Sequence, residues 1–428
     1  MIWVRAEGAD QSVDWDEINA EVRNTGDFHQ YRHPAAICWP LAAGEFKSVV
    51  MAKRLYVVAG ELSGDAHGAG LLRALKPMVG DLEILGVGGP EMAAVGGKGV
   101  CDWVEDAAVM GVWEVLKRYG WFKQRFGEML EELKVYQPDV LLLIDYPGFN
   151  LRFAKKVKGH GIKILYYISP QVWAWHKSRV KKMPGVVDRM KVVFPFEVDI
   201  YEKEGINVEF VGHPLAEKIG TTSNREGFFQ KHGLDPSKKL LGLLPGSRKQ
   251  EVEKIFPTML AAAERLRKTL NIQVAVGVAP NLGASYLKTF ITDDANSTLV
   301  EEATYDVMAY ADAVIVTSGT ATLETGWFGT PMAVVYKTSP ATYTIGKALV
   351  GVPFIGLVNI VAGEKIVPEF VQHEMNVENL SKEMTKQLTD ANYASMMRKS
   401  LSIIKSKLGT PGASARVAEG IIELARCS

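Results

Sequence analysis

Two carboxylates follow directly on apolar runs of this sequence. Glu61 comes after 54-RLYVVAG-60, and Asp145 ends the run 140-VLLLID-145. A carboxylate at the end of a buried strand is partly removed from water, which raises its pKa toward the range of a general base. A turn-forming or helix-capping role is the alternative for Asp145, although Asn150 suits the cap of the following helix better. Asp145 is therefore the first candidate for a base.

Two other turns carry the residue types that bind phosphate, and the first is 317-TSGTATLE-324. Small residues follow an apolar strand there, and a helix is predicted to start near Thr320. Backbone N–H groups without partners and the positive end of the helix dipole would then face a ligand. We expect the N–H groups around Ser318, Gly319 and Thr320 to contact phosphate. Glu324 would accept hydrogen bonds from ribose hydroxyls or serve as an ordinary acid of the first helical turn.

The second such turn, 243-LLPGSRKQE-251, contains Arg248. A guanidinium group binds a diphosphate with two parallel hydrogen bonds, which a lysine does less well. Alone, Arg248 would be interpreted as a surface arginine in a loop. Two phosphate-binding turns in one half of the chain favour the functional interpretation.

The stretch 57-VVAGELSGDAHGAG-70 predicts a tight turn between a strand and a helix, but it lacks both GxGxxG and GK[ST]. Ser63 and Gly64 would lead into the helix. We expect Asp65, in the first helical turn, to act mainly on the helix dipole.

Apolar β-branched runs alternate with helical patterns from residue 54 onward, as in βαβ units with a parallel sheet. We predict two doubly wound α/β domains that face a cleft, with six candidate strands in the first series and four in the second. Residues 51–215 form the first domain and 216–390 the second. Three helical segments are predicted over about 378–426, and residues 391–428 cap the second domain or pack back on the first. Ligands of such sheets bind beyond the carboxyl ends of the strands, where all four turns lie.

The composition, with 47% hydrophobic and 23% charged residues, is typical of a globular protein. Forty-nine basic residues balance forty-nine acidic ones, so no global field attracts nucleic acid. Three cysteines without CxxC spacing indicate a reducing compartment, the cytoplasm, and no structural zinc. No window has the roughly 18 uncharged apolar residues of a membrane span. Residues 1–50 carry no secretory signal, and we expect a poorly ordered or mis-started extension before Met51, with an ordered element as the alternative.

Taken together, these motifs resemble the lipid-A-disaccharide synthase family, glycosyltransferases of the GT-B type with two Rossmann-like domains. The resemblance runs in order from residue 52 to 425, and residues 1–50 match nothing in the family. Gly148 stands where some relatives have a second acid, which leaves Asp145 as the carboxylate to carry over. The matching stretches are 59-AGELSGDAHGA, 86-GVGGPEM, 110-MGVWEVL, 143-LIDYPGFNLR, 166-YYISPQVWAWHKSRVKK, 194-FPFE with Tyr201, 210-FVGHPL, 243-LLPGSR with Glu251, 318-SGTATLE, and 357-LVNIVAG with 367-VPEFVQ.

The resemblance implies transfer of 2,3-diacylglucosamine from its UDP conjugate to 2,3-diacylglucosamine 1-phosphate (lipid X). The products are a β-1,6-linked disaccharide 1-phosphate and UDP, in lipid A synthesis on the cytoplasmic face of the inner membrane. Asp145 becomes the base, with Glu61 as the rival or as a carboxylate for sugar hydroxyls, and Arg248 stabilises the leaving diphosphate. The UDP-sugar is a substrate, so no cofactor is implied and no metal is expected; 14-DWD-16 is interpreted as chance.

The same resemblance implies a set of substrate-binding residues. His213 among them has a turn-stabilising role as its alternative. The set is Ser63, Gly64, Asn150, His213, Ser247, Ser318, Gly319, Thr320, Glu324, Asn359, Glu369 and Gln372.

Substrates with acyl chains require contact with a bilayer surface. The stretch 109-VMGVWEVLKRYGWFKQRF-126 mixes aromatic and basic residues as an interfacial element would, and 173-WAWHKSRVKK-182 repeats the mix. We predict peripheral, salt-sensitive membrane association. Aromatic residues packed in the core are the alternative. The predicted contacts are Val109, Val112, Trp113, Leu116, Lys117, Arg118, Trp121, Phe122 and Lys123.

Two other functions stay open at this point. Another GT-B enzyme, such as a UDP-sugar 2-epimerase or a transferase with a non-lipid acceptor, would have no reason for the aromatic and basic segments. A catalytically silent UDP-sugar-binding or membrane-scaffold protein would have no reason to keep Asp145, Glu61, Arg248 and Glu324. The oligomeric state is open, with a homodimer as one option.

Overall fold

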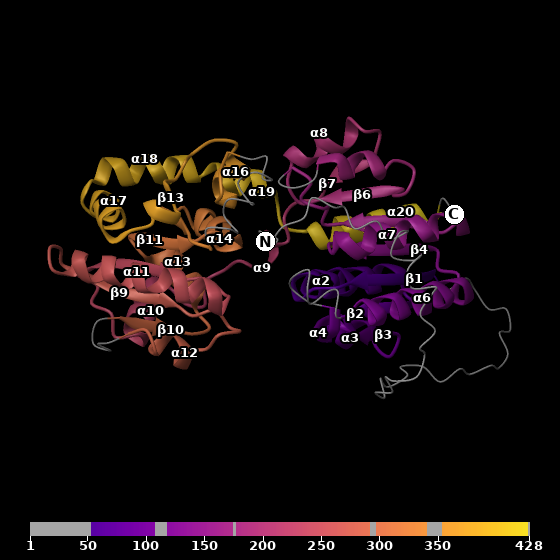
Figure 1. The fold of residues 1–428 in the computed structure, drawn as a ribbon, viewed down its shortest axis with the longest axis horizontal. Coiled ribbons are helices and arrows are strands. Elements are labelled where there is room, and N and C mark those ends of the chain that lie inside the picture. Colours follow the sequence, from indigo (N-terminus) through magenta and orange to yellow (C-terminus); the bar gives the residue numbers. More distant parts are fainter. Residues whose placement is uncertain (1–52, 108–117, 174–176, 292–296, 340–352, 427–428) are drawn as a thin grey trace.

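Two parallel β-sheets, each covered by helices on both faces, make up two domains (Figure 1). The computed structural model describes residues 53–107, 118–173, 177–291, 297–339 and 353–426, so the prediction for residues 1–50 lies outside the described residues. The first sheet has the order β3-β2-β1-β4-β5-β6-β7 and the second β10-β9-β8-β11-β12-β13. The predicted doubly wound α/β class is confirmed.

The elements of the first domain keep the predicted alternation. Its strands are β1 (Lys53–Ala59), β2 (Leu82–Gly88), β3 (Val100–Asp102), β4 (Val140–Ile144), β5 (Lys163–Tyr167), β6 (Arg189–Val192) and β7 (Val208–Phe210). Its helices are α2 (Leu62–Val79), α3 (Pro90–Gly96), α4 (Val104–Ala107), α6 (Tyr119–Tyr136), α7 (Pro147–Val157), α8 (Phe196–Glu202) and α9 (Leu215–Lys218), with 3-10 turns η2 (Lys158–His160) and η3 (Lys177–Lys182).

The second domain repeats the pattern. Its strands are β8 (Lys239–Leu244), β9 (Ile272–Gly277), β10 (Thr298–Val300), β11 (Ala313–Thr317), β12 (Met332–Tyr336) and β13 (Glu369–Val371). Its helices are α10 (Arg225–Lys231), α11 (Lys249–Arg267), α12 (Ala284–Lys288), α13 (Thr304–Tyr310), α14 (Thr320–Phe328) and α16 (Leu357–Ala362), with η5 (Gln372–Glu374). The helices α17 (Val377–Thr389), α18 (Ala391–Leu401), α19 (Ile403–Leu408) and α20 (Ala413–Arg426) follow.

The sequence pattern missed β3, β10 and β13, because strands of three residues are too short to show an alternation. It also predicted three C-terminal helical segments where the structure has four. The side chain of Asp390 accepts a hydrogen bond from the Tyr393 N–H at 3.0 Å, which ends α17 and caps the start of α18.

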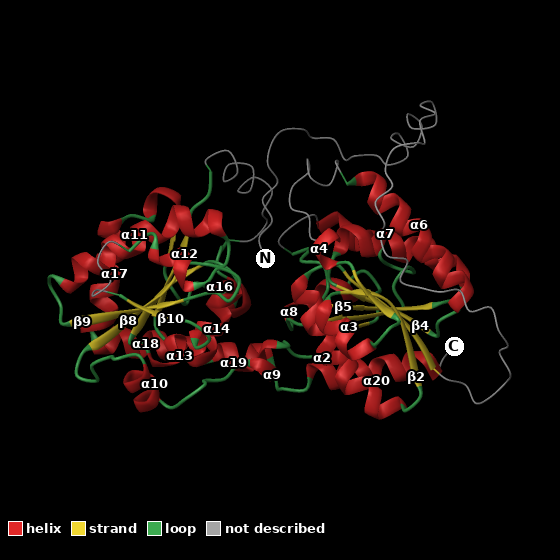
Figure 2. Ribbon diagram, turned by 90° about the horizontal axis from the view of Figure 1, so that it is seen from below, coloured by secondary structure: helices red, strands yellow, loops and turns green. Residues whose placement is uncertain are grey.

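The residues of β1 show how the first sheet is buried on both faces. Leu55 and Val57 belong to one core with α2 and α20, whereas Tyr56 and Val58 belong to another with α6 and α7. Successive residues of a strand point to opposite faces, so a continuous apolar run fits a strand covered on both sides. Figure 2 shows α6 and α7 on one side of this sheet and α2 and α20 on the other.

Substitution of Gly86 in β2 should strongly destabilise the fold. Its φ is 137°, and a Cβ atom there would overlap the Val57 carbonyl oxygen and lie 2.8 Å from the Val57 nitrogen. Because the obstacle is the backbone of the neighbouring strand, we expect Gly86→Ala to lower the free energy of unfolding by about 3 kcal/mol or more. Urea unfolding of the purified chain measures this.

Gly127→Ala in α6 is the matched control for that experiment. A Cβ atom on Gly127 meets no other heavy atom within 4 Å, and alanine favours a helix more than glycine does. The control should unfold at the same or a slightly higher urea concentration. Equal midpoints for the two variants would contradict the steric argument.

The chain passes between the domains twice, and the two crossings are fastened together. The His213 N–H donates to the Leu408 carbonyl at 2.8 Å, and Arg416 Nε donates to the Val211 carbonyl at 2.8 Å. The carboxylate of Glu217 accepts from the Ser414 N–H at 2.8 Å. After the second crossing, α20 returns to the first domain and packs against α2 (Figure 1). Among the described residues, these hydrogen bonds hold the two domains together at the crossings.

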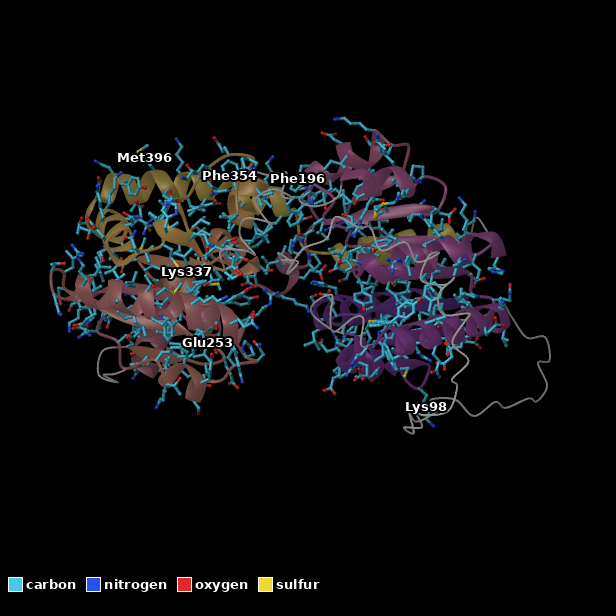
Figure 3. The ribbon with its side chains drawn as sticks, viewed as in Figure 1. Lys98, Phe196, Glu253, Lys337, Phe354 and Met396 are labelled. Carbon is cyan, nitrogen blue, oxygen red and sulfur yellow. The ribbon has the colours of Figure 1, made fainter. Side chains whose placement is uncertain are left out.

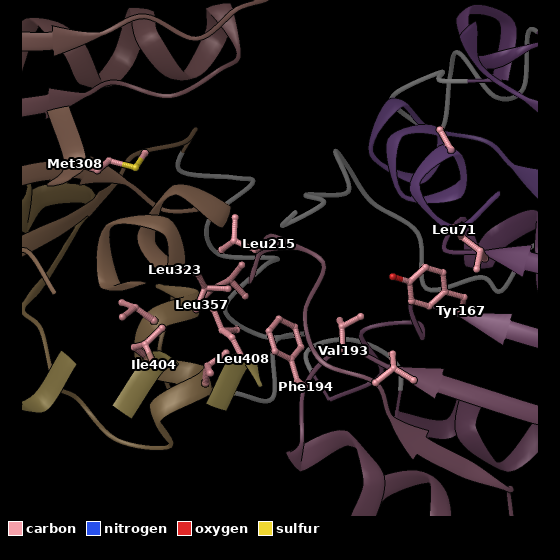
Figure 4. Close-up of a cluster of buried hydrophobic side chains, with 14 of the residues drawn as sticks. Leu71, Tyr167, Val193, Phe194, Leu215, Met308, Leu323, Leu357, Ile404 and Leu408 are labelled. Atoms are coloured by element: carbon pink, nitrogen blue, oxygen red, sulfur yellow. The ribbon is translucent and has the colours of Figure 1, made fainter. Parts of the chain in front are cut away.

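Apolar side chains from both domains pack around these crossings. One core cluster includes Phe194 of the first domain, Leu215 of α9 and Leu357 of the second domain (Figure 4). Figure 3 shows Phe196 and Phe354 on the sides of the domains that face each other. No helix in the described ranges is both long and apolar enough to cross a membrane.

Candidate active site

Glu61 and Asp145 follow neighbouring strands of the first sheet. Ala59 at the end of β1 pairs with Ile144 at the end of β4, so the two carboxylates leave the same edge of the sheet. The turn after β1 needs a glycine, because a Cβ atom on Gly60 would overlap the ring of Tyr146. This close approach joins two acids that lie far apart in the sequence.

The surroundings of these acids favour the protonated form. Burial raises the pKa of Glu61 to about 7, the negative charge of Asp145 adds to this effect, and the positive charge of Arg248 opposes it. Burial also raises the pKa of Asp145 to about 6, against a backbone hydrogen bond from Tyr146. A group that titrates near neutral pH can both take and release a proton.

The backbone of Asp145 is held in an uncommon conformation. Its φ is 46° and that of Tyr146 is 50°, a region that few residues other than glycine occupy. The Asp145 N–H donates to the Tyr167 carbonyl at 3.0 Å. Its carbonyl accepts from Tyr166 Oη at 2.6 Å and from Asn150 Nδ2 at 2.8 Å. These hydrogen bonds fix the strand end from which the carboxylate projects.

Asn150 therefore differs from its predicted roles. The helix α7 starts at Pro147, so Asn150 lies one turn inside it, fully buried, and does not cap its start. Its amide nitrogen donates to the carbonyls of Ile144 and Asp145, which gives it a positioning role, and its predicted contact with substrate stays a prediction. Pro147 in the sequence indicated that the helix starts before Asn150, because proline fits the first position of a helix.

Asp65 also has a different role from the one predicted. Its carboxylate is buried and accepts hydrogen bonds from the N–H groups of Gly89 at 2.8 Å, Glu91 at 2.9 Å and Met92 at 2.8 Å. It caps the start of α3, in addition to lying in the first turn of α2. The carboxylate of Asp65 is therefore occupied inside the domain.

Ser63, Gly64 and His213 are each held by the surrounding structure. Gly64 is buried in the first turn of α2, and the hydroxyl oxygen of Ser63 is buried with no hydrogen-bond partner among the described residues. His213 Nδ1 accepts from the Leu215 N–H at 3.1 Å, and its ring lies 5.1 Å from that of Phe194. Burial lowers the pKa of His213 to about 3, so its imidazole is neutral. The turn-stabilising role of His213 is present.

Arg248 of the second domain is a positive charge that acts on Glu61 of the first domain. It occupies the cap position of α11, and its guanidinium pairs with Glu251 at 2.7 Å. Its positive charge lowers the pKa of Glu61, which follows β1 in the first domain. Ser247 beside it is exposed, and its carbonyl accepts from Asn281 at 2.7 Å. The charge in the turn after β8 therefore reaches the acid in the turn after β1.

The start of α14 fits an anion, with one correction. Thr320 is exposed, Gly319 has a φ of 154°, and the first N–H groups of a helix have no acceptors within it. The Ser318 N–H, however, donates to the Val335 carbonyl at 2.9 Å, and its hydroxyl donates to Ile355 at 2.8 Å. Ser318 therefore supports the turn, whereas the N–H groups of Gly319 and Thr320 stay candidates for phosphate.

Two further predicted residues, Asn359 and Glu369, hold loops of the second domain. Asn359 is fully buried, and its side chain bonds to the backbone of Ile366 and Val367 and to Glu369. Glu369 also accepts from the Gly356 N–H at 2.8 Å. Every polar group of the Asn359 side chain is thus used within the protein, and its predicted contact with substrate stays a prediction.

Gln372 and Glu324 keep partial exposure. The side chain of Gln372 accepts from the Thr338 N–H at 2.8 Å and donates to the Thr338 carbonyl at 3.2 Å, as a neighbouring strand would. Glu324 accepts from the Tyr305 hydroxyl at 3.2 Å, and burial raises its pKa. Its predicted contact with a ribose stays a prediction.

Similarity to known proteins identifies the family to which this chain belongs. A model of the lipid-A-disaccharide synthetase family matches residues 55–414. The chain belongs to this family.

Individual relatives agree with the assignment to the lipid-A-disaccharide synthetase family. The lipid-A-disaccharide synthase of Geobacter sulfurreducens is 44% identical over 381 residues, which cover 87% of this chain and 97% of the relative. That of Myxococcus xanthus is 38% identical over 373 residues, with the same coverage of 87% and 97%. The resemblance predicted from the motifs is confirmed.

Solved structures share the fold at low identity. A UDP-GlcNAc 2-epimerase from Neisseria meningitidis, bound to UDP-GlcNAc, has a TM-score of 0.56 and 11% identity, over 87% of this chain and 99% of that one. The spinosyn rhamnosyltransferase SpnG has a TM-score of 0.51 and 14% identity, over 86% of this chain and 100% of that one. These likenesses confirm the fold with two α/β domains.

In this member of the lipid-A-disaccharide synthetase family, the predicted membrane contacts are only partly visible. Val109, Val112, Trp113, Leu116 and Lys117 lie outside the described residues. Arg118 and Lys123 are exposed, and Arg118 pairs with Asp106 at 2.9 Å.

Trp121 and Phe122 are half-buried in the same family member. The ring of Trp121 lies 5.8 Å from Trp103 and 4.9 Å from Phe122, within a core that continues to Phe126 and Phe149. The alternative that these aromatic residues pack inward therefore holds in part, because α6 must cover its sheet face.

The sequence did not single out Tyr166, Tyr146 or Tyr305 in this family member. Tyr166 was hidden in an apolar strand, and only the sheet register brings its hydroxyl to Asp145. Tyr146 closes over Gly60 and donates to the Ala107 carbonyl at 3.0 Å. The sequence did offer one indication: Tyr146 directly follows Asp145, the carboxylate at the end of a strand.

Proposed function

We propose that this chain is a lipid-A-disaccharide synthase, an inverting glycosyltransferase. It transfers 2,3-diacylglucosamine from UDP-2,3-diacylglucosamine to 2,3-diacylglucosamine 1-phosphate, giving the β-1,6-linked disaccharide 1-phosphate and UDP. One observation carries the proposal: the positive charge of Arg248 in the second domain acts on Glu61 of the first, which leaves the same sheet edge as Asp145. The strand-end groups of both domains thus meet at one place.

The first domain supplies the base. The 6-hydroxyl oxygen of the acceptor attacks the anomeric carbon of the donor, and the proton of that hydroxyl moves to the Asp145 carboxylate. The raised pKa of Asp145, about 6, leaves it mostly ionised at neutral pH while making it a better proton acceptor than a free aspartate. Tyr166 and Asn150 keep its strand end in place. Glu61, with a pKa of about 7, is the rival base or a partner for sugar hydroxyls.

The second domain stabilises the leaving group. As the bond from the anomeric carbon to the UDP oxygen breaks, negative charge grows on the diphosphate. The Arg248 guanidinium and the N–H groups at the start of α14 are the donors placed to receive that charge. These donors suit a reaction that uses no metal, and a metal-free site stays a prediction.

Both substrates carry acyl chains, so the enzyme works at a membrane surface. Peripheral association with the cytoplasmic face of the inner membrane follows from the substrates and from the exposed Arg118 and Lys123 at the start of α6. A homodimer as the working unit stays a prediction, which light scattering of the purified chain would test.

The decisive experiment is to incubate the purified full chain with UDP-2,3-diacylglucosamine and lipid X in neutral detergent micelles. We expect disaccharide 1-phosphate and UDP in equal amounts, identified by mass spectrometry. Release of UDP that does not depend on lipid X would contradict the acceptor assignment.

The same assay separates the alternatives. A 2-epimerase would convert a UDP-sugar to its C2 epimer without an acceptor, and a silent binding protein would bind UDP without turnover. The 2-epimerase from Neisseria meningitidis shares only the fold, at 11% identity, whereas the family match covers residues 55–414. The transferase assignment is therefore favoured.

A further inference from the structure

Glu197 is a buried carboxylate that the proposed mechanism does not use. It is the second residue of α8, and its relative exposure is 1%. It lies beside two turns: residues 168–173 after β5, which we call the β5 turn, and residues 193–195 after β6, which we call the β6 turn. Among the described residues, no cation forms an ion pair with Glu197. A buried carboxylate without a cationic partner must be satisfied by hydrogen bonds, so its donors indicate its role.

The hydrogen bonds of Glu197 join the two turns. Its Oε1 atom accepts from the Ser169 hydroxyl at 2.8 Å and from Trp173 Nε1 at 3.0 Å, both in the β5 turn. Its Oε2 atom accepts from the Phe194 N–H of the β6 turn at 3.1 Å. A single side chain therefore holds two neighbouring strand ends together.

Aromatic packing supports the same junction. The ring of Trp173 meets those of Phe194 and Phe196 edge-on, at 6.3 and 5.4 Å, and the last two rings are stacked at 5.6 Å. The Tyr201 hydroxyl, also buried, donates to the Pro170 carbonyl at 2.9 Å. The β5 turn, the β6 turn and α8 thus form one packed unit.

The β5 turn is connected directly to the strand end that carries Asp145. The Asp145 N–H donates to the carbonyl of Tyr167, the residue that precedes the β5 turn, at 3.0 Å. Ile168, the first residue of the turn, has a φ of 61°, which is unfavourable for a branched side chain and must be held by the surrounding structure. A displacement of the β5 turn would therefore reach the backbone of Asp145.

A carboxylate suits the position of Glu197 better than an amide of the same size. Each of its oxygens faces a backbone or indole N–H, and neither of these groups can accept a hydrogen bond. Glutamine would turn its NH₂ group toward one of them, so one of the two turns would lose a link. Burial raises the pKa of Glu197 to about 7, and these donors oppose that rise.

We propose that Glu197 is a positioning residue for the transfer reaction, which holds Asp145 in place through the β5 turn. The inference rests on the proposed function, in which Asp145 takes the proton of the acceptor hydroxyl. Glu197 itself is enclosed by its donors and by the aromatic rings, and it does not touch substrate.

A double-mutant cycle tests this inference by steady-state kinetics. Glu197→Gln should lower kcat by about tenfold or more, because small displacements of a reacting group suffice for such a loss. In the Asp145→Asn background the same change should alter kcat by less than about twofold, because the group that Glu197 positions is already lost. The affinity for UDP, measured by calorimetry, should stay within about twofold, since the second domain is proposed to bind it.

An NMR titration of the Asp145 carboxyl carbon gives a readout that needs no activity. Burial raises the pKa of Asp145 to about 6, so a loosened β5 turn that admits water should lower this pKa. Glu197→Gln should show that decrease. Ser169→Ala keeps the carboxylate of Glu197 and removes one link to the turn, so it should give a smaller decrease even if Glu197→Gln does not fold.

Asp188→Asn is the matched control. Asp188 precedes β6, and its carboxylate accepts from the Ile164 N–H of β5 at 2.8 Å. It thus joins the same two strands as Glu197, at their opposite ends. This variant should leave both kcat and the titration of Asp145 unchanged.

Three results would overturn the inference. They are an equal loss of kcat from Glu197→Gln with and without Asp145→Asn, an unchanged Asp145 titration in both Glu197→Gln and Ser169→Ala, and an equal shift of that titration in Asp188→Asn. A wild-type chain without transferase activity would instead refute the proposed function, while the NMR titration would still decide whether Glu197 holds Asp145. The two failures can therefore be told apart.

Discussion

Replacing Asp145 by asparagine should lower kcat by about 10²- to 10⁴-fold, the range that general bases contribute. Asparagine has nearly the same shape but cannot accept the proton of the attacking hydroxyl. The backbone hydrogen bonds from Tyr166 and Asn150 hold the carbonyl of residue 145, not its side chain, and remain. KM for both substrates should change little. Steady-state kinetics with UDP-2,3-diacylglucosamine and lipid X measures the effect.

The pH profile gives this prediction a second readout. Because burial raises the pKa of Asp145 to about 6, the base becomes protonated as the pH falls through about 6, and the wild-type rate should decline there. Above that pH the base is ionised and the rate should level off. The Asp145→Asn variant should lose this decline along with most of its rate.

Glu61→Gln is the matched comparison, because Glu61 leaves the adjacent strand and also titrates near neutral pH. If Asp145 is the base, this variant should keep a larger share of kcat than Asp145→Asn. It should leave the pH at which the rate declines nearly unchanged, because Glu61, with a pKa of about 7, is mostly protonated and neutral where Asp145 titrates. A normal kcat for Asp145→Asn together with a collapse for Glu61→Gln would reverse the two roles.

Replacing Arg248 by alanine should lower kcat by about 10²- to 10³-fold, as when a donor that stabilises developing charge is removed. The guanidinium lies at the cap of α11, opposite the acids of the first domain. Arg248→Lys should recover only part of the rate, because an ammonium group does not bind two phosphate oxygens in the same plane. Kinetics at saturating donor, with UDP affinity by calorimetry, measures the loss.

Arg267→Ala is the matched control for Arg248→Ala. Arg267 is in the same helix and pairs with Glu264 at 3.2 Å, three residues away, as Arg248 pairs with Glu251 at 2.7 Å. It lies at the far end of α11, so its loss should leave kcat unchanged. Similar rates for the two alanine variants would remove Arg248 from the mechanism.

Removal of Arg248 should also move the titration of Glu61. The positive charge of Arg248 lowers the pKa of Glu61, so its loss should raise that pKa further. An NMR titration of the Glu61 carboxyl carbon in the two arginine variants would detect the shift. No difference between them would mean that the two domains do not face each other in solution as described.

Local patterns in the sequence were sufficient to predict much of this molecule. Apolar runs such as 140-VLLLID-145 predicted strands buried on both faces, and turn residues marked where each run ends. Since ligands of parallel sheets gather beyond those ends, Asp145, Glu61 and Arg248 could be selected before their distances were known. The family resemblance followed from the same turns, because they are the parts that the chemistry constrains.

The tertiary structure alone decided which polar groups are occupied inside the protein. Asn150, Asp65 and Asn359 have residue types that suit substrate binding, yet each bonds to backbone groups that lie nearby only after folding. A pattern in the sequence records periodicity within an element, whereas the partner of a buried side chain depends on the register between elements. The pairing of Ala59 with Ile144, and the return of α20 to the first domain, are such non-local facts. They place Glu61 beside Asp145 and fasten the two domains together.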